Sequence, residues 1–475
     1  MKIKLLLPIL LSFSVLASCG AKEDKPYYFV ETKPEETVTS EVYFGSHNGT
    51  YLTEPFTYSD KYFDDDFFKG KLNLSLGRVG FGVALSSTKF EINKHVFSDF
   101  GYSDITSYED KETYDGAFYV FGHKKIVDRN MVLVSIRGSE YKQEWASNFN
   151  IGNSGDHAGF SIAAHLIIDS LKEYLSEYNL TDNPKIWITG YSRAAGISNL
   201  LGKYVYNDSF FMMEENDHDL YVTAYETPEC AVDDGKKYPF VVNICNSDDF
   251  VIRHPTYDFI TLGNSFYYDK YADSKKADEY CHNLEKDYPT PYFFPKKINI
   301  TGNPFIVDDY NSNMTLNDFY DLLMKTAYCD TSSLEDKDKY LDISTREKYM
   351  DNVFYSASYL LAKAFSLSEA NLVLIIDYYS SDMSKALSIL QIFMSDFEEK
   401  QLYDLLVEVF DVGQIDYEVE ELTKVSEQLT PYIKTIKAIM GNSLLNNLAT
   451  IAGNIYFIRY KHQQPLVYSY LNIIE

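Results

Sequence analysis

The stretch that most constrains the fold is KIWITGYSRAAGISNLL, residues 185–201. Four residues that favour β-structure, IWIT, run into GYSRA, and an apolar pattern with helical spacing follows. This pattern predicts a strand, a tight turn and a helix, with Ser192 at the apex of the turn. Small residues must flank such a serine because strand and helix nearly touch there, and the helix N-terminus offers backbone N–H groups to an oxyanion. Ordinary strand-to-helix turns also match by chance, so the interpretation depends on the rest of the chain.

The composition indicates a globular protein without affinity for nucleic acid. The chain has 475 residues, which is long enough for a large core and for two or three domains. Its content of 45% hydrophobic and 16% aromatic residues is that of a folded chain. Lys and Arg total 43 against 70 Asp and Glu, and the resulting net charge of −27 repels phosphate backbones. We therefore expect no nucleic-acid partner.

The first 19 residues, MKIKLLLPILLSFSVLASC, have two lysines, a short apolar run and small residues before a cysteine, which is the pattern of an export signal. The ending Leu16-Ala17-Ser18-Cys19 resembles the bacterial lipobox, in which the cysteine thiol takes a diacylglyceryl group and becomes the new N-terminus. The resemblance implies an exported lipoprotein, anchored by two acyl chains at the extracytoplasmic face of the cell membrane. A secretory signal cut elsewhere is the alternative. No later apolar run predicts a transmembrane helix.

Four cysteines remain after Cys19, and their spacing does not choose among the three possible pairings. They are Cys230, Cys245, Cys281 and Cys329. Cysteines of exported proteins are either bridged or buried as thiols, and the sequence leaves both options open. Because no C-x-x-C pair occurs, we expect no zinc site.

Changes in composition divide the chain into five parts. Residues 1–19 predict a lipoprotein signal peptide, and the polar residues 20–57 predict a tether. Residues 58–256 predict an α/β core. Residues 257–441 predict a mainly helical insertion, which we expect to cap the strand ends and form an apolar acyl pocket; a separate helical domain is the alternative. Residues 442–475 predict C-terminal helices that return a histidine to the core.

Within the insertion, three local patterns indicate helices. Thr315-x-x-Asp318 and Ser366-x-x-Glu369 are capping-box signatures. Apolar residues recur at helical spacing over 387–397, which is more typical of a core-facing stripe than of a lipid-binding face.

The predicted elements of the core follow the order of an α/β protein. They are a helix within 67–87, strands over 116–126 and 130–136, a long amphipathic helix after His157, the serine strand, and strands over 221–225 and 240–244. A strand, a helix and a strand joined by short turns predict a parallel pair with a right-handed crossover. Catalytic groups of open α/β sheets gather beyond the C-terminal strand ends, where Ser139, Ser192 and Asp249 would lie.

At this point the residues resemble those of the class 3 lipase family, within the α/β-hydrolase fold, and especially its bacterial lipase-like branch. The match spans about residues 72–255 and resumes at the C-terminus. Its pieces, in chain order, are Ile136-Arg137-Gly138-Ser139, Glu144-Trp145 with Asn148-Phe149, His157-Ala158-Gly159-Phe160, the serine turn, Glu226-Thr227-Pro228 and Asp249-Phe250-Val251. The resemblance implies a mostly parallel sheet flanked by helices, with the large insertion placed before the histidine.

The resemblance also implies roles for individual residues. Ser192 matches the nucleophile, and Asp249 matches the acid that orients the histidine. Ser139 matches an oxyanion-hole residue, and the backbone N–H of Arg193 would be the second donor. Asp248 is the rival to Asp249, because consecutive residues of an extended chain point to opposite sides.

Three histidines follow the acid, as the chain order of α/β-hydrolases requires. His462 lies in His-x-x-Pro-x-x-Tyr, which resembles the terminal phrase of the branch, and Pro465 would open a last helix just after it. His254 lies five residues beyond Asp249, and His282 lies in a polar stretch that looks exposed. We therefore expect His462 to complete the triad.

Two residues of the serine turn depart from the family pattern. Tyr191 replaces the usual histidine before the nucleophile, and Ala194 replaces the usual glycine two residues after it. Neither change removes a reacting group, so we interpret both as variation that leaves activity intact.

The expected function is that of a lipid-anchored serine carboxylester hydrolase, a lipase or esterase with a Ser-His-Asp triad and an acyl-enzyme intermediate. Its partners would be an ester or lipid substrate and the membrane, and it would need no metal and no cofactor. Two alternatives stay open. One is another acyl-transfer enzyme, such as a peptidase or acyltransferase, and the other is a catalytically silent surface lipoprotein that uses the fold for binding.

Overall fold

The structure is a computed structural model of the chain. It describes residues 28–30, 34–47, 50–69, 71–110, 115–138, 144–148, 150–152, 154–213, 218–249, 251–253, 259–285, 378, 398–440 and 462–474. The chain forms two compact units. The sheet unit comprises Ala21–Ser139, Gly155–Phe293 and Arg459–Glu475, and the helical unit comprises Met1–Gly20, Glu140–Ser154 and Phe294–Ile458.

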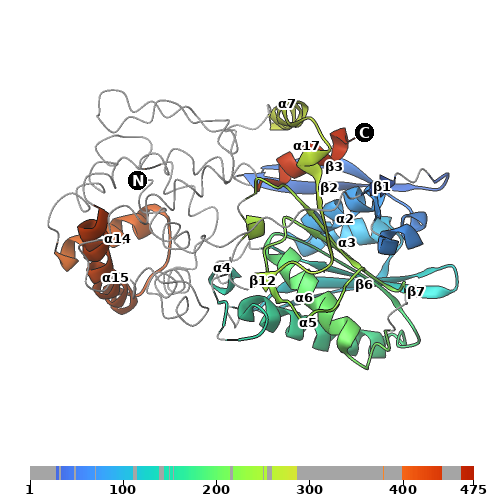
Figure 1. The fold of residues 1–475 in the computed structure, drawn as a ribbon, viewed down its shortest axis with the longest axis horizontal. Coiled ribbons are helices and arrows are strands. Elements are labelled where there is room, and N and C mark those ends of the chain that lie inside the picture. The colour runs from blue at the N-terminus through green and yellow to red at the C-terminus, as the bar shows by residue number, and fades with distance from the viewer. Residues whose placement is uncertain are drawn as a thin grey trace. The chain divides into compact units, whose positions relative to one another are not determined.

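A central sheet lies between helices in the sheet unit (Figure 1). It has seven strands, in the order β13-β11-β9-β8-β7-β6-β5. Five of them, β7, β8, β9, β11 and β13, run parallel, and β5 and β6 add an antiparallel edge. The strands are β5 (Ser103–Glu109), β6 (Phe118–Ile126), β7 (Arg129–Ile136), β8 (Lys185–Tyr191), β9 (Leu220–Tyr225), β11 (Val241–Cys245) and β13 (Asn264–Tyr267). The parallel pairing of β7 with β8 confirms the predicted crossover.

Helices cover both faces of this sheet (Figure 1). On one face lie α5 (Ala158–Glu177) and α6 (Arg193–Asn207), and on the other lie α2 (Leu74–Ser86) and α3 (Phe90–Asp99). The protein therefore has an α/β-hydrolase-type fold, as the sequence predicts.

Strand β8 shows why the sequence of a buried parallel strand is continuously apolar. Ile186 and Ile188 are fully buried in the core beneath α5 and α6. The alternate residues face α2, where the Thr189 hydroxyl donates to the Gly80 carbonyl at 3.1 Å. Trp187 is also fully buried, and its Nε1–H donates to Thr223 Oγ1 at 3.1 Å. Both faces of β8 are thus removed from water. The strand therefore has no exposed face on which polar residues would alternate with apolar ones.

The tether predicted over 20–57 is wrong wherever the structure describes these residues. β2 (Val38–His47) and β3 (Thr50–Tyr58) form an antiparallel hairpin that packs on α2 and α3, and β1 (Tyr28–Val30) pairs with β4 (Lys71–Asn73). The physical reason is alternation: Ser40, Val42 and Phe44 are buried, whereas the residues between them are exposed. A period of two over TVTSEVYF predicts a strand with one buried face, and the polar average hides it.

The predicted core boundary at residue 256 also falls too early. Strand β13 pairs with β11, and α7 (Ser274–Glu285) belongs to the sheet unit as well. β13 has only four residues, NSFY, and therefore shows little periodicity of its own. Its place is set by tertiary contacts, because the buried Asn243 side chain donates to the Leu262 carbonyl at 2.7 Å.

The last helix, α17 (Gln464–Ile473), packs against α2 and α7. Pro465 lies in its first turn, which confirms that the helix opens just after His462. Short elements complete the sheet unit: β10 (Ala231–Val232), β12 (Phe259–Ile260), and the 3-10 turns η1 (Asp60–Tyr62), η2 (Asp65–Lys69), η3 (Val251–Arg253) and η4 (Tyr268–Lys270).

The described part of the helical unit contains α4 (Glu144–Ser147), α14 (Glu399–Val412) and α15 (Val419–Met440). A capping box between Glu398 and Gln401 starts α14. Helices α14 and α15 pack on each other, and Leu405 of α14 and Leu422 of α15 are buried. The patterns at 315–318, 366–369 and 387–397 lie outside the described residues, and the cap over the strand ends stays a prediction.

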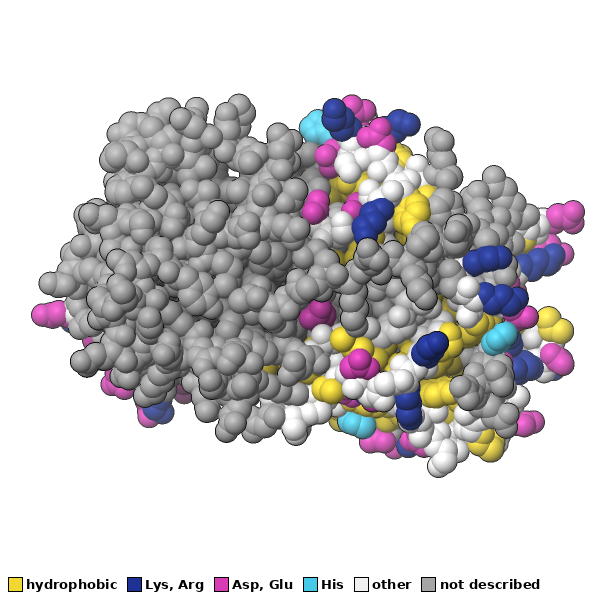
Figure 2. Space-filling view, in the orientation of Figure 1, with side chains coloured by type: hydrophobic (Ala, Val, Ile, Leu, Met, Phe, Trp, Pro, Cys, Tyr) yellow, Lys and Arg dark blue, Asp and Glu magenta, His cyan; other side chains and the backbone are white. Residues whose placement is uncertain are grey.

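No helix among the described residues is long and apolar enough to cross a bilayer. On the visible face of the sheet unit, Lys and Arg side chains are interspersed with Asp and Glu (Figure 2). The described residues of this face therefore present mixed charge rather than a patch of one sign.

Candidate active site

Ser192 lies on the turn between β8 and α6, as the sequence predicts. It is the N-cap of α6, with φ 60° and ψ −128°. A positive φ is strained for a residue with a Cβ and persists only where the surroundings impose it. Ser192 is half-buried, and its backbone N–H donates to the Tyr225 carbonyl at 2.8 Å. The turn therefore holds the hydroxyl beyond the end of the sheet.

Glycine is required on both sides of this turn. A Cβ on Gly190 would lie 2.5 Å from the Ala194 carbonyl oxygen, and a Cβ on Gly138 would lie 2.9 Å from the carbonyl oxygen of Tyr191. Ala194 itself is accommodated and fully buried. The segment after β7 thus approaches the serine turn at Gly138, one residue before Ser139. Ser139 itself lies outside the described residues.

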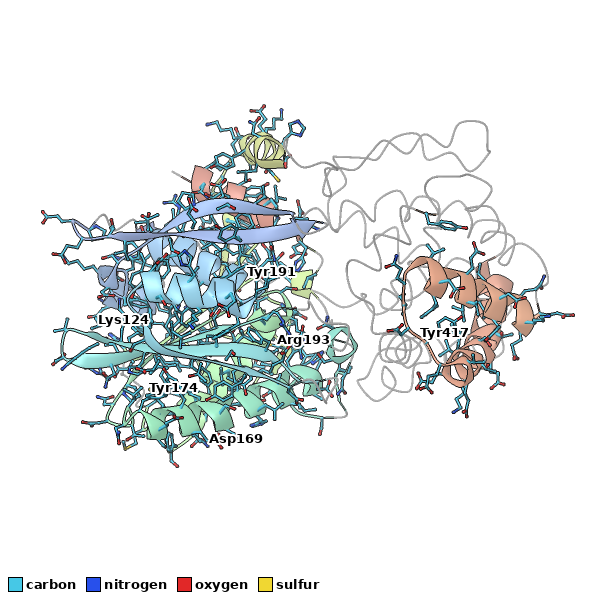
Figure 3. The ribbon with its side chains drawn as sticks, turned by 180° about the vertical axis from the view of Figure 1, so that it is seen from behind. Lys124, Asp169, Tyr174, Tyr191, Arg193 and Tyr417 are labelled. Atoms are coloured by element: carbon cyan, nitrogen blue, oxygen red, sulfur yellow. The ribbon has the colours of Figure 1, made fainter. Side chains whose placement is uncertain are left out.

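Arg193 is the first residue of α6, so its backbone N–H lies at the N-terminus of this helix. Its side chain is almost fully buried, and the guanidinium donates to the Gly116 carbonyl at 2.9 Å. Figure 3 shows Arg193 and Tyr191 at the same end of the sheet, away from Lys124. The side chain fixes the loop before β6, while the backbone N–H stays at the helix N-terminus.

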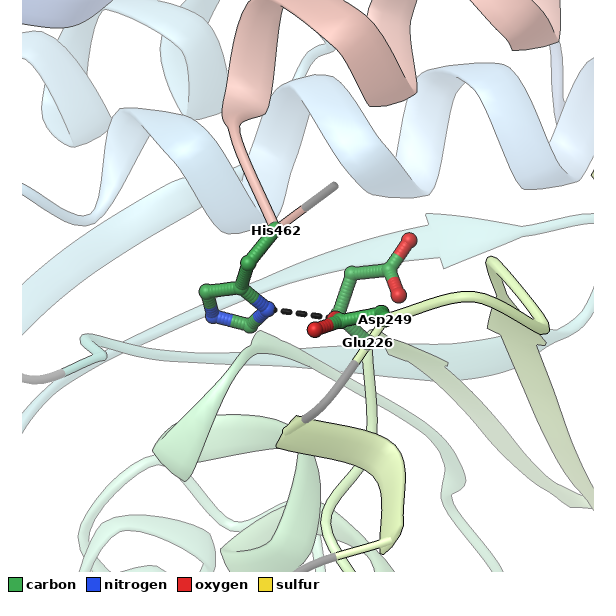
Figure 4. A group of neighbouring side chains, drawn as sticks. All are labelled: Glu226, Asp249 and His462. Atoms are coloured by element: carbon green, nitrogen blue, oxygen red, sulfur yellow. Dashed lines mark hydrogen bonds and ion pairs between the residues drawn. The ribbon is translucent and has the colours of Figure 1, made fainter. Parts of the chain in front are cut away.

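The structure brings His462, Asp249 and Ser192 into one hydrogen-bonded relay. His462 Nε2 lies 2.8 Å from Ser192 Oγ. On the other side of the ring, His462 Nδ1 lies 2.5 Å from Asp249 Oδ2, and Figure 4 shows this second contact. The Asp249 side chain is fully buried, whereas the His462 side chain is 20% exposed. If the hydroxyl donates to Nε2, then Nδ1 carries the proton that faces the carboxylate.

The loop after β11 presents Asp249, and not Asp248, to the histidine. The backbone N–H of Asp249 donates to the Asn246 carbonyl at 3.0 Å, and Oδ1 accepts the Val251 N–H at 2.9 Å. These two bonds hold the carboxylate in one orientation. Among the rival histidines, His282 lies exposed on α7. His254 lies outside the described residues.

Tyr191 contacts the histidine directly, which the sequence analysis did not foresee. Its hydroxyl donates to the backbone carbonyl of His462. The two rings stack with centroids 5.1 Å apart and an interplanar angle of 28°. The residue that departs from the family pattern thus ties the serine strand to the C-terminal turn, and nothing local in the sequence signals a contact 271 positions away.

A second buried carboxyl group, Glu226, was also missed. It follows β9 directly and is fully buried beside Asp249 and His462 (Figure 4). Burial raises the pKa of Glu226, and the nearby Asp249 carboxylate raises it further. The Glu226-Thr227-Pro228 phrase marked this position in the sequence without assigning it a role.

These three side chains are also the one group with metal-ligand spacing in the described part of the chain. One ligand atom from each lies within 4.8 Å of the other two. However, His462 already uses one ring nitrogen for Ser192 and the other for Asp249. A metal ion would have to break the relay to gain the imidazole as a ligand.

Two other motifs of the family resemblance, those that contain Arg137 and His157, make contacts that stabilise the scaffold. The Arg137 guanidinium carbon lies 4.6 Å from the centre of the Phe118 ring, and the group pairs with Glu109 at 3.5 Å. His157 caps α5 by accepting the Phe160 N–H and stacks on the Phe160 ring. Glu144 lies in α4 of the helical unit.

Three of the four remaining cysteines are buried free thiols. They are Cys230, Cys245 and Cys281, whereas Cys329 lies outside the described residues. Burial raises the pKa of the Cys230 and Cys245 thiols, which keeps both groups protonated.

Comparison with solved structures finds partial likeness to lipases. A triacylglycerol lipase with a serine protease triad aligns at 15% identity over 42% of this chain and 80% of its own, with a TM-score of 0.34. The triacylglyceride lipase of Rhizomucor miehei aligns at 14% identity over 40% and 78%, with a TM-score of 0.29. The Lip2 lipase from Yarrowia lipolytica aligns at 15% identity over 35% and 67%, with a TM-score of 0.28. No family model and no curated protein sequence matches the chain.

Proposed function

We propose that this protein is a serine carboxylester hydrolase that acts through Ser192, His462 and Asp249. The observation that carries the proposal is the pair of hydrogen bonds at His462, 2.8 Å to the serine hydroxyl and 2.5 Å to the carboxylate. A strained serine at a helix N-terminus, an imidazole in contact with it and a buried carboxylate behind the imidazole are the parts that nucleophilic acyl transfer requires.

In the first half of the reaction, Ser192 Oγ attacks the ester carbonyl carbon and its proton moves to His462 Nε2. Asp249 holds Nδ1–H and stabilises the imidazolium that forms. The tetrahedral intermediate then expels the alcohol, which takes the proton from Nε2, and the acyl group remains on Oγ. In the second half, water attacks the acyl carbon, His462 takes the water proton, and the carboxylic acid leaves as Oγ regains its proton.

The negative charge of the tetrahedral intermediate requires donors near Ser192. We assign one donor to the backbone N–H of Arg193, at the N-terminus of α6. We assign the second to Ser139, because Gly138 packs close to the carbonyl of Tyr191. Such donors usually supply the largest single part of the rate enhancement, and removing one costs about 100- to 1,000-fold in kcat.

The resemblance of the sequence motifs to class 3 lipases favours a carboxylic ester as the substrate, and a lipid ester in particular. The test is labelling with a fluorophosphonate probe followed by hydrolysis of p-nitrophenyl esters of short and long chains. We expect the wild type to be labelled and Ser192→Ala to be neither labelled nor active. Ser198→Ala is the matched control, because Ser198 lies on the same helix and its hydroxyl only donates to the Ala194 carbonyl.

The outcomes separate the competing functions. Absence of labelling in the folded wild type would sink the hydrolase proposal and favour a silent binding protein. Labelling together with turnover of amides or acceptor alcohols, but not of esters, would favour a peptidase or an acyltransferase.

We further propose that Cys19 is lipidated and holds the enzyme at the extracytoplasmic face of the membrane. The support is the lipobox-like ending of the export signal. Partitioning into the detergent phase of Triton X-114 should be lost in Cys19→Ala. Equal partitioning of both forms would leave cleavage at another position as the better interpretation.

A further inference from the structure

We propose that Glu226 is a second acid of the relay, a carboxyl group that positions Asp249 and that can take its place at His462. The inference rests on the proposed function, because it concerns the same site. Its first support is topological. Strand β9 lies between β8, which leads to Ser192, and β11, which leads to Asp249. Glu226 follows β9 directly, so it leaves the sheet at the same edge as both.

The contacts of Glu226 connect it to the loop that carries Asp249. Its carboxyl oxygens lie 3.2 and 3.0 Å from the Asn246 backbone nitrogen, whose N–H they accept, and the Tyr268 hydroxyl donates to Oε1. Asn246 begins the loop after β11. The backbone of Glu226 has a φ of 49°, which is strained for a residue with a Cβ. The fold thus keeps a strained conformation that directs a buried carboxyl group at this loop.

Glu226 also lies close to Asp249 and to His462. One oxygen of Glu226, one oxygen of Asp249 and one ring nitrogen of His462 lie within 4.8 Å of one another. Two carboxyl groups this close, and shielded from water, do not both ionise near neutral pH. The imidazole contacts Asp249, whereas burial and the nearby Asp249 raise the pKa of Glu226, so Glu226 keeps its proton. In this state Glu226 presents a neutral O–H beside a charged neighbour.

Apart from His462, the described residues named around Glu226 are neutral or acidic. Burial, followed by the proximity of Glu226, raises the pKa of the Cys245 thiol and of the Tyr268 hydroxyl, so both stay neutral. Asp269, on η4, accepts the Ser247 N–H at 2.7 Å and adds a carboxylate to this region. Among the described residues that face Glu226, His462 is therefore the group that can become cationic.

These relations predict how the site responds to the loss of Asp249. In Asp249→Ala the negative charge that opposes ionisation of Glu226 is gone, and space opens beside Nδ1. Glu226 can then release its proton to solvent and accept the Nδ1–H of His462, directly or through one water. Alanine is the informative substitution because an amide at position 249 could impose the wrong imidazole tautomer.

The test is a double-mutant cycle of Asp249→Ala and Glu226→Gln, measured as kcat/KM for an ester over a range of pH. Glutamine retains an oxygen to accept from Asn246 and Tyr268 and an N–H to donate to Asp249. We expect Glu226→Gln alone to lose about threefold, because the amide keeps most of the contacts that position Asp249, and Asp249→Ala to lose about 100-fold. The double variant should lose at least about tenfold more than Asp249→Ala, because only a carboxylate can replace a carboxylate as the acid.

The pH profile separates replacement from a merely structural role. Activity of Asp249→Ala should rise as Glu226 ionises, and the double variant should lack this rise. An equal loss from Glu226→Gln in both backgrounds, with no difference in pH profile, would overturn the inference. So would a severe loss of activity in folded Glu226→Gln alone, which would mean that a charged Glu226 is needed beside Asp249.

Two controls complete the experiment. Asp234→Asn is the matched variant, because Asp234 accepts the Tyr238 hydroxyl at 2.5 Å outside the proposed site; it should leave kcat/KM unchanged. Fluorophosphonate labelling of the wild type reports on the proposed function separately. Failure to label would sink that function, whereas normal labelling with an additive cycle would sink only the role of Glu226.

Discussion

Replacing Gly190 by alanine tests whether the serine turn must be as tight as it is. The added methyl carbon would lie 2.5 Å from the Ala194 carbonyl oxygen and 2.8 Å from the Ala194 Cβ. Ordinary contact begins near 3.4 Å, so the overlap with the carbonyl oxygen is about 0.9 Å. The obstacle is helix backbone, which cannot rotate aside as a side chain can. Overpacking of this kind costs about 1–3 kcal/mol of stability.

The larger effect should fall on activity. Relief of the clash moves the first turn of α6 by a large part of an ångström, and a misplacement of about 1 Å costs on the order of 100-fold in rate. We therefore expect Gly190→Ala to remain folded by urea denaturation and to lose about 100-fold in kcat and in the rate of fluorophosphonate labelling. Gly77→Ala is the control, because its Cβ would meet only the ends of flexible side chains, Ile244 at 3.2 Å and Leu72 at 3.7 Å. Wild-type labelling of folded Gly190→Ala would refute the reasoning.

The remaining predictions concern the tyrosine before the nucleophile, the buried glutamate and the thiols. Tyr191→Phe removes the hydrogen bond to the His462 carbonyl, and leaving that carbonyl unpaired costs about 1–3 kcal/mol. If this energy holds the histidine in place, kcat should fall about five- to 150-fold in a folded protein, and an unchanged kcat would show that the contact does not position the histidine. Because the pKa of Glu226 is raised, the folded state keeps a proton that the unfolded state releases, and wild-type stability is lost as pH rises above the unfolded value of about 4.3. Urea denaturation should therefore show that the free energy of unfolding of the wild type, compared with that of Glu226→Gln, falls by about 1.4 kcal/mol per pH unit until Glu226 itself ionises. A difference between the two proteins that does not vary with pH would contradict this prediction. Without reductant, Cys230, Cys245 and Cys281 should react with Ellman's reagent only after denaturation. Prompt reaction of any of these three thiols in the native protein would contradict their burial.

The sequence by itself determined several elements around the site and the three residues that meet there. Local patterns were sufficient for β8, α6 and α17, because periodicity, β-branched residues and a proline near a helix start act over a few residues. The triad residues of α/β-hydrolases occur along the chain in the order serine, acid, histidine, and this order limited the candidate triads to a few combinations. Pro465 after His462 placed the histidine just before a helix, which the structure confirms.

Alternation was equally present in the sequence at β2 and β3, but the polar composition of that region concealed it. In a strand with one exposed face, half of the residues are polar by construction, so an average over the segment resembles a tether. The buried Val42 and Phe44 show that the pattern, and not the average, carried the structural information.

Only the tertiary structure decided which groups surround the reacting atoms. Besides Ser192, the neighbours of His462 include Tyr191, Asp249 and Glu226, which come from three different strands of the sheet or the segments that follow them. Strand order brings these residues together, and strand order depends on the packing of whole helices and strands rather than on any local pattern. A buried carboxyl group next to another one has no signature in sequence, because its protonation is set by distance and by exclusion of water, and both exist only once the chain has folded.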